Sequence, residues 1–462
     1  MKTRNLIVLS LLALIIGISS CRDDLDFDLA SNDLSFSTDT INLDTIFNHT
    51  NSQTYKFTVH NNQDEDVEIP RIALTRGVDS FFKLNVDGMS GYEFENVPVR
   101  KNDSIYIFVE IAAGEAPINP NYEDEIIFET TGNTQQVKLL SYIERAEFHI
   151  TPDGQDYLDI DCETWDNSQS HVIFGNVRVL HCLTINPGTK IYFHDNSGLT
   201  VNSGAIFDVN GNLGNEVIFR TDRMDERSDS LPKMWDRILL KNPEVSSKID
   251  YAVIKGGTVG LEVEGSTNLK ITNTKILNND ELGLYAKGAD IKGYNLVINN
   301  SDVASLAIEG GSYDFRNCSI GNFHNIGQGA GNNYSLFLSN DGFPLSQANF
   351  YNCVFYGRAS NAIVFDNVSG LFNHDFEYNV MRLDFPDEFP TNTFGNNLVE
   401  DPLFVNPGFG MNDLRFLIDS PAIGHASFSY LVPETMTDIM GVTRTSTGLN
   451  PGAYEGSVNP DE

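Results

Sequence analysis

The residues best suited to recognise a ligand gather at one interruption of an otherwise regular sequence. His324, Tyr334 and Phe343 lie in or beside an insertion at 322–334, and Arg358 follows one turn later. Aromatic and polar groups that emerge together suit stacking and hydrogen bonding to sugars. We therefore take His324, Tyr334 and Arg358 as a candidate ligand loop. A loop without any ligand role is the alternative.

Signatures of catalysis are missing from the sequence. Glycoside hydrolysis needs two carboxyl groups at a set separation, and the repeats contain no N-T-D, D-D or G-H-G set. The nucleophile and metal motifs G-x-S-x-G, H-E-x-x-H and C-x-x-C do not occur. Arg316, Lys255, Glu309 and Asp366 are charged, but their spacing does not bring them together. We therefore expect no catalytic residues, and the sequence favours a binding function over an enzymatic one.

The charge of the chain limits its partners. The 462 residues carry 64 acidic and 30 basic side chains, a formal net charge of -34. Such a chain repels phosphate backbones, so we expect no nucleic acid partner. The acidity is explained by solubility alone or by calcium binding, because calcium prefers oxygen ligands. We assign no metal-ligating residue and no cofactor, with calcium as the alternative.

The N-terminus reads as an export signal. Lys2 and Arg4 precede an apolar run at 6–18, and Ser19 and Ser20 precede Cys21. The run is too short for a stable membrane span and is typical of a secretory signal. An ordinary cleaved signal that happens to contain a cysteine is one interpretation of this stretch.

The tetrad I-S-S-C at 18–21 resembles a bacterial lipobox. This resemblance implies that cleavage leaves Cys21 as the lipidated N-terminus, and acyl chains would then anchor the protein to a membrane. The following R-D-D at 22–24 resembles the surface-export signal of Bacteroidetes-type lipoproteins. The resemblance implies an outer-membrane lipoprotein exposed at the cell surface. We expect polysaccharides or other surface proteins as its partners.

A repeat organises the middle of the chain. Each unit contains a short run that ends in an apolar anchor, at 251–254, 273–276, 295–298, 317–320 and 352–355. A fixed period near 22 residues with short β-rich runs is typical of a stacked solenoid. We therefore predict a parallel β-helix. The extra residues of the fourth repeat, at 322–334, are expected to leave the stack as a loop.

Asparagines mark the corners of the predicted stack. Asn273, Asn295, Asn317 and Asn352 each occur once per repeat, directly before the anchoring strand. Asparagine tolerates left-handed backbone angles, and its amide can bond to the next asparagine along the stack. We interpret these four residues as a structural ladder.

Two further segments resemble a known family. The segment at 165–222, which includes L-T-I-N-P-G-T, is similar to the opening turns of right-handed β-helix repeat proteins. Near the C-terminus, S-P-A-I-G (420–424), D-I-M-G-V-T-R (438–444) and G-A-Y-E (452–455) resemble the closing motifs of secreted bacterial members of that family. Gly424 stands where the family favours aspartate. We expect this closing segment to cap the last turn, which would otherwise expose an unpaired edge.

The N-terminal part has a different pattern. Short alternating strands such as S-I-Y-I-F-V-E-I at 104–111, and two runs joined by T-G-N at 131–133, predict hairpins and a β-sandwich. The segment resembles the immunoglobulin-like domains that follow the lipidated cysteine in many surface proteins. Such a domain usually serves as a spacer.

Four cysteines lie beyond the signal. Cys318 and Cys353 occupy the same place in consecutive repeats, so we expect them to stack about 4.8 Å apart if the insertion between them leaves the stack. That spacing suits either a disulfide or a reduced apolar pair. Cys162 and Cys182 are expected to be free thiols.

These observations together predict an all-β protein. A β-sandwich precedes a right-handed parallel β-helix that ends in a cap. The expected parts are a lipoprotein signal at 1–20, a tether at 21–32, an immunoglobulin-like sandwich at 33–148, the β-helix at 155–400, and final turns with the cap at 401–462. The expected function is that of a cell-surface binding or scaffold module for carbohydrate or partner proteins. The alternative is a diverged polysaccharide lyase or glycoside hydrolase.

Overall fold

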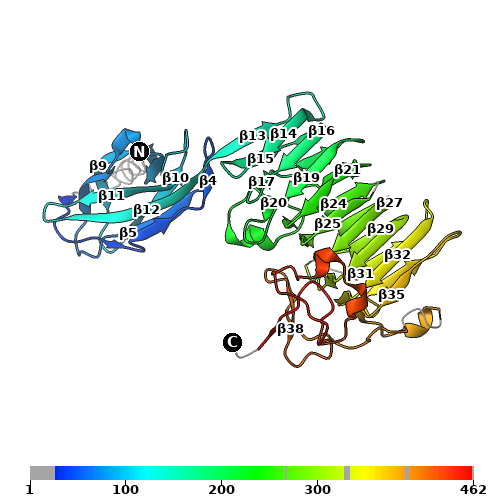
Figure 1. The fold of residues 1–462 in the computed structure, drawn as a ribbon. Helices are drawn as coiled ribbons and strands as arrows, with labels where there is room; N and C mark the ends of the chain where they lie inside the picture. The colour runs from blue at the N-terminus through cyan, green and yellow to red at the C-terminus, as the bar shows by residue number, and fades with distance from the viewer. Residues whose placement is uncertain (1–26, 266–267, 327–332, 391–394, 460–462) are drawn as a thin grey trace, which may run out of the picture. The chain divides into compact units, whose positions relative to one another are not determined.

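The computed structural model describes residues 27–265, 268–326, 333–390 and 395–459 (Figure 1). The chain divides into two units, the first ending at Ile143 and the second beginning at Glu144. Within the described residues, helical structure is limited to five short 3-10 turns, and no helix is long and apolar enough to cross a membrane. These turns are η1 (Gly77–Asp79), η2 (Glu226–Ser230), η3 (Pro386–Glu388), η4 (Phe428–Tyr430) and η5 (Pro433–Thr435).

The first unit consists of two sheets. The larger one contains β1 (Asp28–Leu29), β3 (Thr40–Asn42), β4 (Ile46–Phe47), β6 (Val67–Leu74), β9 (Glu93–Val99), β11 (Asn121–Glu129) and β12 (Thr134–Glu144). The smaller one runs in the order β2 (Ser35–Phe36), β5 (Tyr55–His60), β10 (Ser104–Ile111), β7 (Phe82–Val86) and β8 (Met89–Gly91).

Alternating side chains build the core of the first unit. Along β10, Ile105, Ile107, Val109 and Ile111 are buried while the residues between them face outward. The buried residues pack with those of the larger sheet into one apolar cluster. The predicted hairpin at 131–133 is present, because β11 and β12 pair antiparallel from Glu129↔Thr134 onward.

The predicted immunoglobulin-like architecture needs correction. The strand at each end of the larger sheet pairs in parallel with its neighbour, β1 with β6 and β3 with β12. The predicted sandwich, in contrast, is built from antiparallel strands. Strand β1 also lies inside the segment at 21–32 that we expected to be a tether. Its two residues are exposed, so no apolar alternation marked it in the sequence.

The second unit contains two large sheets of parallel strands, and Figure 1 shows many of these strands stacked side by side. The ten-stranded sheet runs through β13 (Ala146–Ile150), β15 (Ser170–Phe174), β17 (Lys190–Phe193), β20 (Val217–Thr221), β23 (Ala252–Lys255), β26 (Lys275–Asn279), β28 (Val297–Ser301), β30 (Ser319–Asn322), β33 (Val354–Gly357) and β36 (Val380–Met381).

The fourteen-stranded sheet bends into two faces, because its long strands pair with different partners along their length. For example, β16 pairs with β18 near its start and with β19 near its end. The strands are β14 (Leu158–Trp165), β16 (Asn176–Ile185), β18 (Gly198–Val201), β19 (Ile206–Asn210), β21 (Ile238–Lys241), β22 (Lys248–Asp250), β24 (Val259–Glu264), β25 (Leu269–Thr272), β27 (Leu282–Tyr294), β29 (Ala304–Arg316), β31 (Tyr334–Ser339), β32 (Leu345–Tyr351), β34 (Ile363–Asp366) and β35 (Asp375–Glu377).

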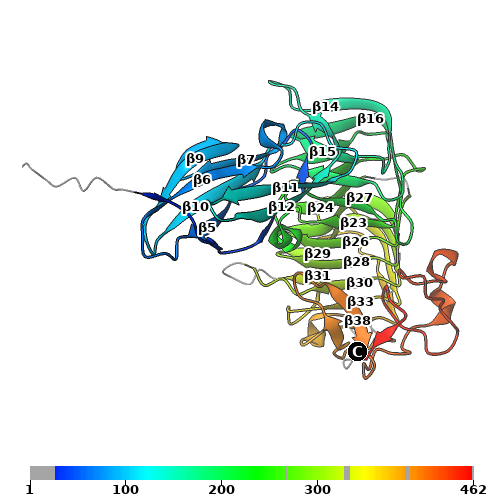
Figure 2. The ribbon, with the colours of Figure 1, turned by 90° about the vertical axis from the view of Figure 1, so that its left-hand side faces the viewer.

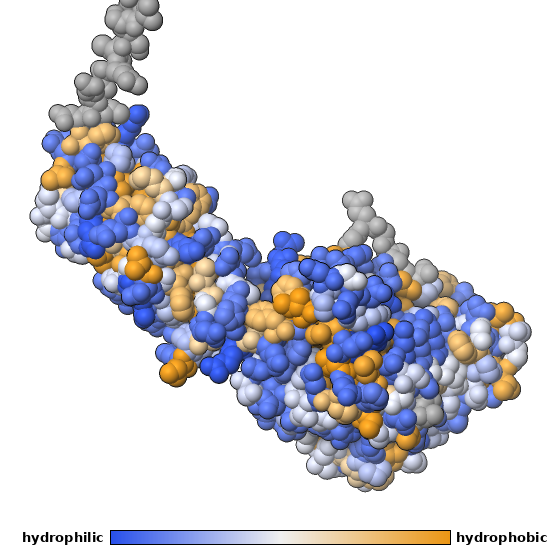
Figure 3. Space-filling view, turned by 90° about the horizontal axis from the view of Figure 1, so that it is seen from above, coloured by the Kyte–Doolittle hydropathy of each residue, from blue (hydrophilic) through white to orange (hydrophobic). Residues whose placement is uncertain are grey.

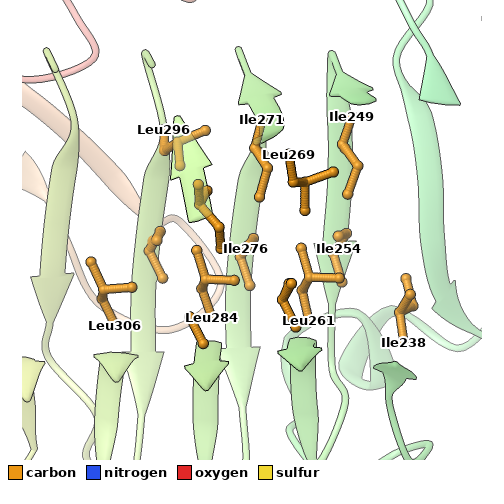
Figure 4. Close-up of a cluster of buried hydrophobic side chains, with 14 of the residues drawn as sticks. Ile238, Ile249, Ile254, Leu261, Leu269, Ile271, Ile276, Leu284, Leu296 and Leu306 are labelled. Carbon is orange, nitrogen blue, oxygen red and sulfur yellow. The ribbon is translucent and has the colours of Figure 1, made fainter. Parts of the chain in front are cut away.

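The repeat sets the register of the ten-stranded sheet. Ile254, Ile276, Ile298, Ile320 and Phe355 are paired in that order on successive strands. All five are fully buried, and they share one interior with aliphatic side chains of the other sheet. Figure 4 shows residues of both sheets in this interior, among them Ile254 and Ile276 from the first and Leu261 and Leu284 from the second. We call this arrangement of stacked strands the coil.

The asparagines occupy left-handed corners, as their spacing predicts. Asn273, Asn295, Asn317 and Asn352 have φ of 49°, 54°, 51° and 55°. The amide stack is only partly formed, because Asn295 Nδ2 donates to Asn273 Oδ1 at 2.9 Å while both amide atoms of Asn317 lack partners among the described residues. A second series was not predicted: Asn278 and Asn300 also have positive φ, and Asn300 Nδ2 donates to Asn278 Oδ1 at 3.2 Å.

The C-terminal segment does not add turns or an end cap. Its only sheet in the described residues is formed by β37 (Phe404–Asn406), β38 (Asp413–Leu417) and β39 (Ser457–Val458). Leu414 packs against Val297, and Phe416 packs against Val354 and Val380, all of them on strands of the ten-stranded sheet. The segment, orange to red in Figure 2, therefore covers the outward apolar side chains of several strands rather than the last turn alone.

The predicted fold class, a β-sandwich followed by a right-handed parallel β-helix that ends in a cap, is therefore wrong as stated. The first unit has parallel edge pairings, the second unit begins at Glu144 rather than at 155, and the closing segment lies along a side of the coil. Strand β13 already pairs with β15 in parallel, from Ala146↔Ser170 to Ile150↔Phe174. Residues 146–150 match none of the repeats, so this strand could not be assigned to the coil from sequence.

The cysteines also differ from expectation. Cys162 and Cys182 form a disulfide, with Cα atoms 4.5 Å apart, instead of remaining free thiols. Their strands β14 and β16 pair in parallel, and the two residues are direct register partners. Cys318 and Cys353 are free and fully buried, which settles the open alternative in favour of a reduced apolar pair.

Candidate functional site

The predicted ligand loop is gathered around one asparagine, Asn322. Its Nδ2 donates to the carbonyl of Tyr334 at 2.9 Å, and its Oδ1 accepts from the backbone N–H of His324 at 3.3 Å. The backbone N–H of Arg358 donates to the Asn322 carbonyl at 2.9 Å. The three predicted residues are therefore neighbours, as their positions in the repeat suggest.

His324 is not available for stacking on a ligand. Its residue is 4% exposed, its ring centroid lies 5.1 Å from that of Phe409, and its Nδ1 lies 3.3 Å from Asp302 Oδ1. Burial lowers the pKa of His324, against the opposing effect of Asp302. The start of the insertion therefore packs into the unit, which corrects the expectation that the whole insertion leaves the stack. Residues 327–332 lie outside the described residues.

Phe343 also has a packing role. It is 47% exposed, but its ring covers two glycines of neighbouring strands. A Cβ at Gly288 would lie 2.9 Å from the ring, and a Cβ at Gly310 would lie 2.3 Å from the Phe343 Cβ. Both glycines have positive φ. Phe343 therefore fills a surface that these glycines leave open.

A hollow that sequence reasoning missed lies in the first unit. It has a volume of about 440 Å³ and opens on the outer face of the smaller sheet. Its lining residues come from β10, from β7 and β8, from the residue that follows β8, and from the residue that precedes β5. They are Thr54, Lys83, Leu84, Asn85, Ser90, Gly91, Tyr92, Phe108 and Glu110.

Cross-strand register places an aromatic ring among polar side chains in this hollow. Phe108, 38% exposed, is paired with Asn85, and Asn85 is paired with Ser90 on the next strand. Glu110 is paired with Lys83 in the neighbouring row. Since directly opposed residues on one face lie about 5 Å apart, these groups surround the ring.

Local hydrogen bonds orient the polar wall of the hollow. Asn85 Nδ2 donates to Ser90 Oγ at 3.2 Å, and Asn85 Oδ1 accepts from the backbone N–H of Gly88 at 3.0 Å. Gly88 has a φ of 84° in the turn between β7 and β8. The turn therefore fixes the amide of Asn85 beside Phe108 before any ligand arrives.

A signal for this surface was present in the sequence. The strand S-I-Y-I-F-V-E-I at 104–111 alternates strictly, so its outward positions carry Tyr106, Phe108 and Glu110. Two large aromatic residues on the solvent face of one strand are unusual for a spacer domain, because exposed aromatic patches commonly mark binding sites. On the face seen in Figure 3, apolar residues form small patches among hydrophilic ones.

One cluster in the second unit has the composition of a metal site, although no metal ligand was expected. The ligating atoms of Glu147, His149 and His171 lie within 4.8 Å of one another. His149 Nε2 and His171 Nδ1 are 3.0 Å apart, and His171 Nδ1 is 3.8 Å from Glu147 Oε2. Burial lowers the pKa of both imidazoles, to about 4 for His171.

The remaining predicted site residue, Cys21, lies outside the described residues. The same holds for the signal at 1–20, so the lipid anchor stays a prediction.

No protein-family model and no curated protein matches the chain. Among the solved structures that match is a family 123 glycoside hydrolase from Clostridium perfringens, described for glycolipid glycan hydrolysis. It aligns at 9% identity over 24% of this chain, with a TM-score of 0.18. This chain spans 26% of that protein's length. XylC in complex with xylose aligns at 12% identity over 91% of this chain and 88% of its own, with a TM-score of 0.32. At these TM-scores neither likeness supports an argument about fold or function.

Proposed function

We propose that this protein binds carbohydrate in the hollow of the first unit. The observation that carries the proposal is the exposed ring of Phe108 beside the amide of Asn85 and the carboxylate of Glu110. An aromatic face packs against the C–H groups of a sugar, while amide and carboxylate groups bond its hydroxyls. The proposal moves the ligand from the predicted loop at His324 to the unit expected to be a spacer.

The size of the hollow favours a sugar over a partner protein. Small-molecule sites commonly occupy roughly 300–1,000 Å³ and combine apolar side chains with a few oriented polar groups. The hollow has about 440 Å³ and this mixture of residues. A stable protein interface instead needs roughly 800 Å² of surface from each partner.

Binding is also favoured over hydrolysis at this place. A glycosidase needs two carboxyl groups on either side of the scissile bond, and among the residues that line the hollow only Glu110 carries one. The glycoside hydrolase alternative therefore depends on a second carboxyl group from elsewhere. Product analysis decides between the two functions.

The test is a glycan array followed by calorimetry on the polysaccharide that is retained. We expect Phe108→Ala to lower affinity at least tenfold. Tyr142→Ala is the control, because Tyr142 is 40% exposed on the larger sheet of the same unit and does not line the hollow. Equal loss in both variants would contradict the proposal. New reducing ends or unsaturated uronates would instead identify a hydrolase or a lyase.

The location of the protein remains part of the proposal. We infer from I-S-S-C at 18–21 that Cys21 carries the lipid and holds the protein at the outer membrane, exposed at the cell surface. Cys21→Ala is expected to release the protein from the membrane fraction. Continued incorporation of radioactive palmitate into this variant would exclude Cys21 as the lipid site.

A further inference from the structure

The first strands of the second unit bring three potential metal ligands to one point. β13 and β15 pair in parallel, with Glu147 directly opposite His171. His149 lies two residues beyond Glu147, so the alternation of a strand places it on the same face. The chain thus presents one carboxylate and two imidazoles from two adjacent strands.

The two imidazoles are held rigidly. Trp165 stacks on both rings, with centroids 4.6 Å from His149 and 4.6 Å from His171. Its indole N–H donates to Glu163 Oε2 at 2.7 Å, which fixes the plane of the stack. The residues of both histidines are nearly fully buried. Little conformational freedom remains to be lost when a ligand binds.

The carboxylate keeps the site open to solvent. The side chain of Glu147 is 51% exposed, and its Oε2 accepts a hydrogen bond from Gln169 Nε2 at 2.7 Å. The oxygen that Gln169 holds, Oε2, is also the one that lies 3.8 Å from His171 Nδ1. An ion here would have water as a further ligand on the exposed side.

We propose that Glu147, His149 and His171 form a binding site for a divalent transition metal ion of the zinc type. Two nitrogen ligands at zinc-ligand distances and a tetrahedral angle lie about 3.3 Å apart, and the two nitrogens here are 3.0 Å apart. An ion bound between them would replace the hydrogen bond that now joins His149 Nε2 to His171 Nδ1, and the two rings would turn until both nitrogens face the ion. Imidazole ligands favour such metals over calcium or magnesium, which prefer oxygen.

The surrounding charge suits a cation. Glu163 and Asp166 lie close enough to act electrostatically on these histidines, in addition to Glu147 itself. No lysine or arginine is among the groups that act electrostatically on the two imidazoles in the described residues. A divalent ion would therefore compensate negative charge that the fold has gathered at the start of the coil.

The experiment is a zinc titration by calorimetry on the full chain after removal of metal with a chelator. We expect one equivalent of zinc to bind, and cobalt to give the visible absorption of a four-coordinate ion. Glu147→Gln is expected to weaken zinc binding at least tenfold without loss of fold, because its side chain is half-exposed. His149→Asn is expected to abolish the cobalt absorption.

The matched control is His181→Gln. His181 is exposed and contacts one carboxylate, Asp161, so its loss should leave the stoichiometric site unchanged. Absence of stoichiometric binding in the wild-type chain would overturn the proposal and leave the histidines as a packing element beside Trp165. Equal weakening in Glu147→Gln and His181→Gln would also overturn it.

Discussion

Arg444 donates a hydrogen bond from Nη1 to Oδ1 of Asn295, at 2.8 Å and across 149 residues of sequence. Both residues are buried. The guanidinium also donates to three backbone carbonyls, those of Thr435, Thr437 and Gly452. The arginine of the D-I-M-G-V-T-R motif therefore joins the C-terminal segment to an asparagine corner of the coil.

We predict that Arg444→Met destabilises the second unit by about 3–5 kcal/mol, because removing one side of a buried charged network leaves its partners unsatisfied. Both tryptophans of the chain, Trp165 and Trp235, lie in this unit. Urea unfolding followed by tryptophan fluorescence therefore measures the effect. Arg415→Met is the control, because Arg415 pairs with Asp413 at an exposed position, and its loss should cost less than about 1 kcal/mol.

The asparagine corners offer a matched pair for a second prediction. Asn295 and Asn317 have φ of 54° and 51°, and both are fully buried. Asn295 bonds through its amide to Asn273 and Arg444, whereas the amide of Asn317 has no partner among the described residues. Glycine accepts the positive φ at either position. Asn295→Gly should therefore cost about 2–4 kcal/mol and Asn317→Gly about 1 kcal/mol or less.

Urea midpoints of these two glycine variants check this difference. Similar losses would mean that the corner conformation, and not the amide bonds, makes asparagine necessary at both positions.

The repeat could be recognised from sequence because each repeat unit of the coil uses the same local chemistry. A buried anchor such as Ile276 or Ile298 and a left-handed asparagine recur every 22 residues, so spacing alone gives their register. The hydrogen bond between Arg444 and Asn295 has no such periodicity. The motif around Arg444 could be noticed, but its partner on a distant corner could not.

The candidate sites were hidden for a related reason. Phe108 and Asn85 become neighbours only through the pairing of β10 with β7, and Glu147 meets His171 only through β13 and β15. Neither pairing follows from a repeated period. His324, in contrast, was visible as an interruption of the repeat, but sequence could not reveal that Phe409 and Asp302 enclose it.

Stability should depend on pH through Glu455. Burial raises the pKa of Glu455 to about 7, although Asn450 and Arg444 act in the opposite direction. The folded state therefore binds the proton more tightly than the unfolded chain, whose glutamate has a pKa near 4.5. This contribution is complete below about pH 4.5 and is lost as the pH rises through 7, and it amounts to about 3 kcal/mol.

Glu455→Gln isolates this contribution, because the amide stays neutral at every pH. We expect the difference in unfolding free energy between wild type and Glu455→Gln to change by about 3 kcal/mol between pH 4.5 and pH 8. Parallel pH profiles of the two proteins would show that Glu455 does not titrate differently in the folded state.

The cysteines give the final prediction, since one pair is linked and the other is buried. Cys162 and Cys182 are joined across 20 residues, and Cys162 is exposed. Mild reduction in the native state should make these two accessible to iodoacetamide, while Cys318 and Cys353 stay unlabelled until the coil unfolds. In the chain-entropy model, a closed loop of this length stabilises the fold by about 3 kcal/mol, so the Cys162→Ser, Cys182→Ser double variant should lose about that amount. Site-resolved mass spectrometry reads the labelling. Early modification of Cys318 would contradict the buried pair, and labelling of Cys182 before reduction would contradict the disulfide.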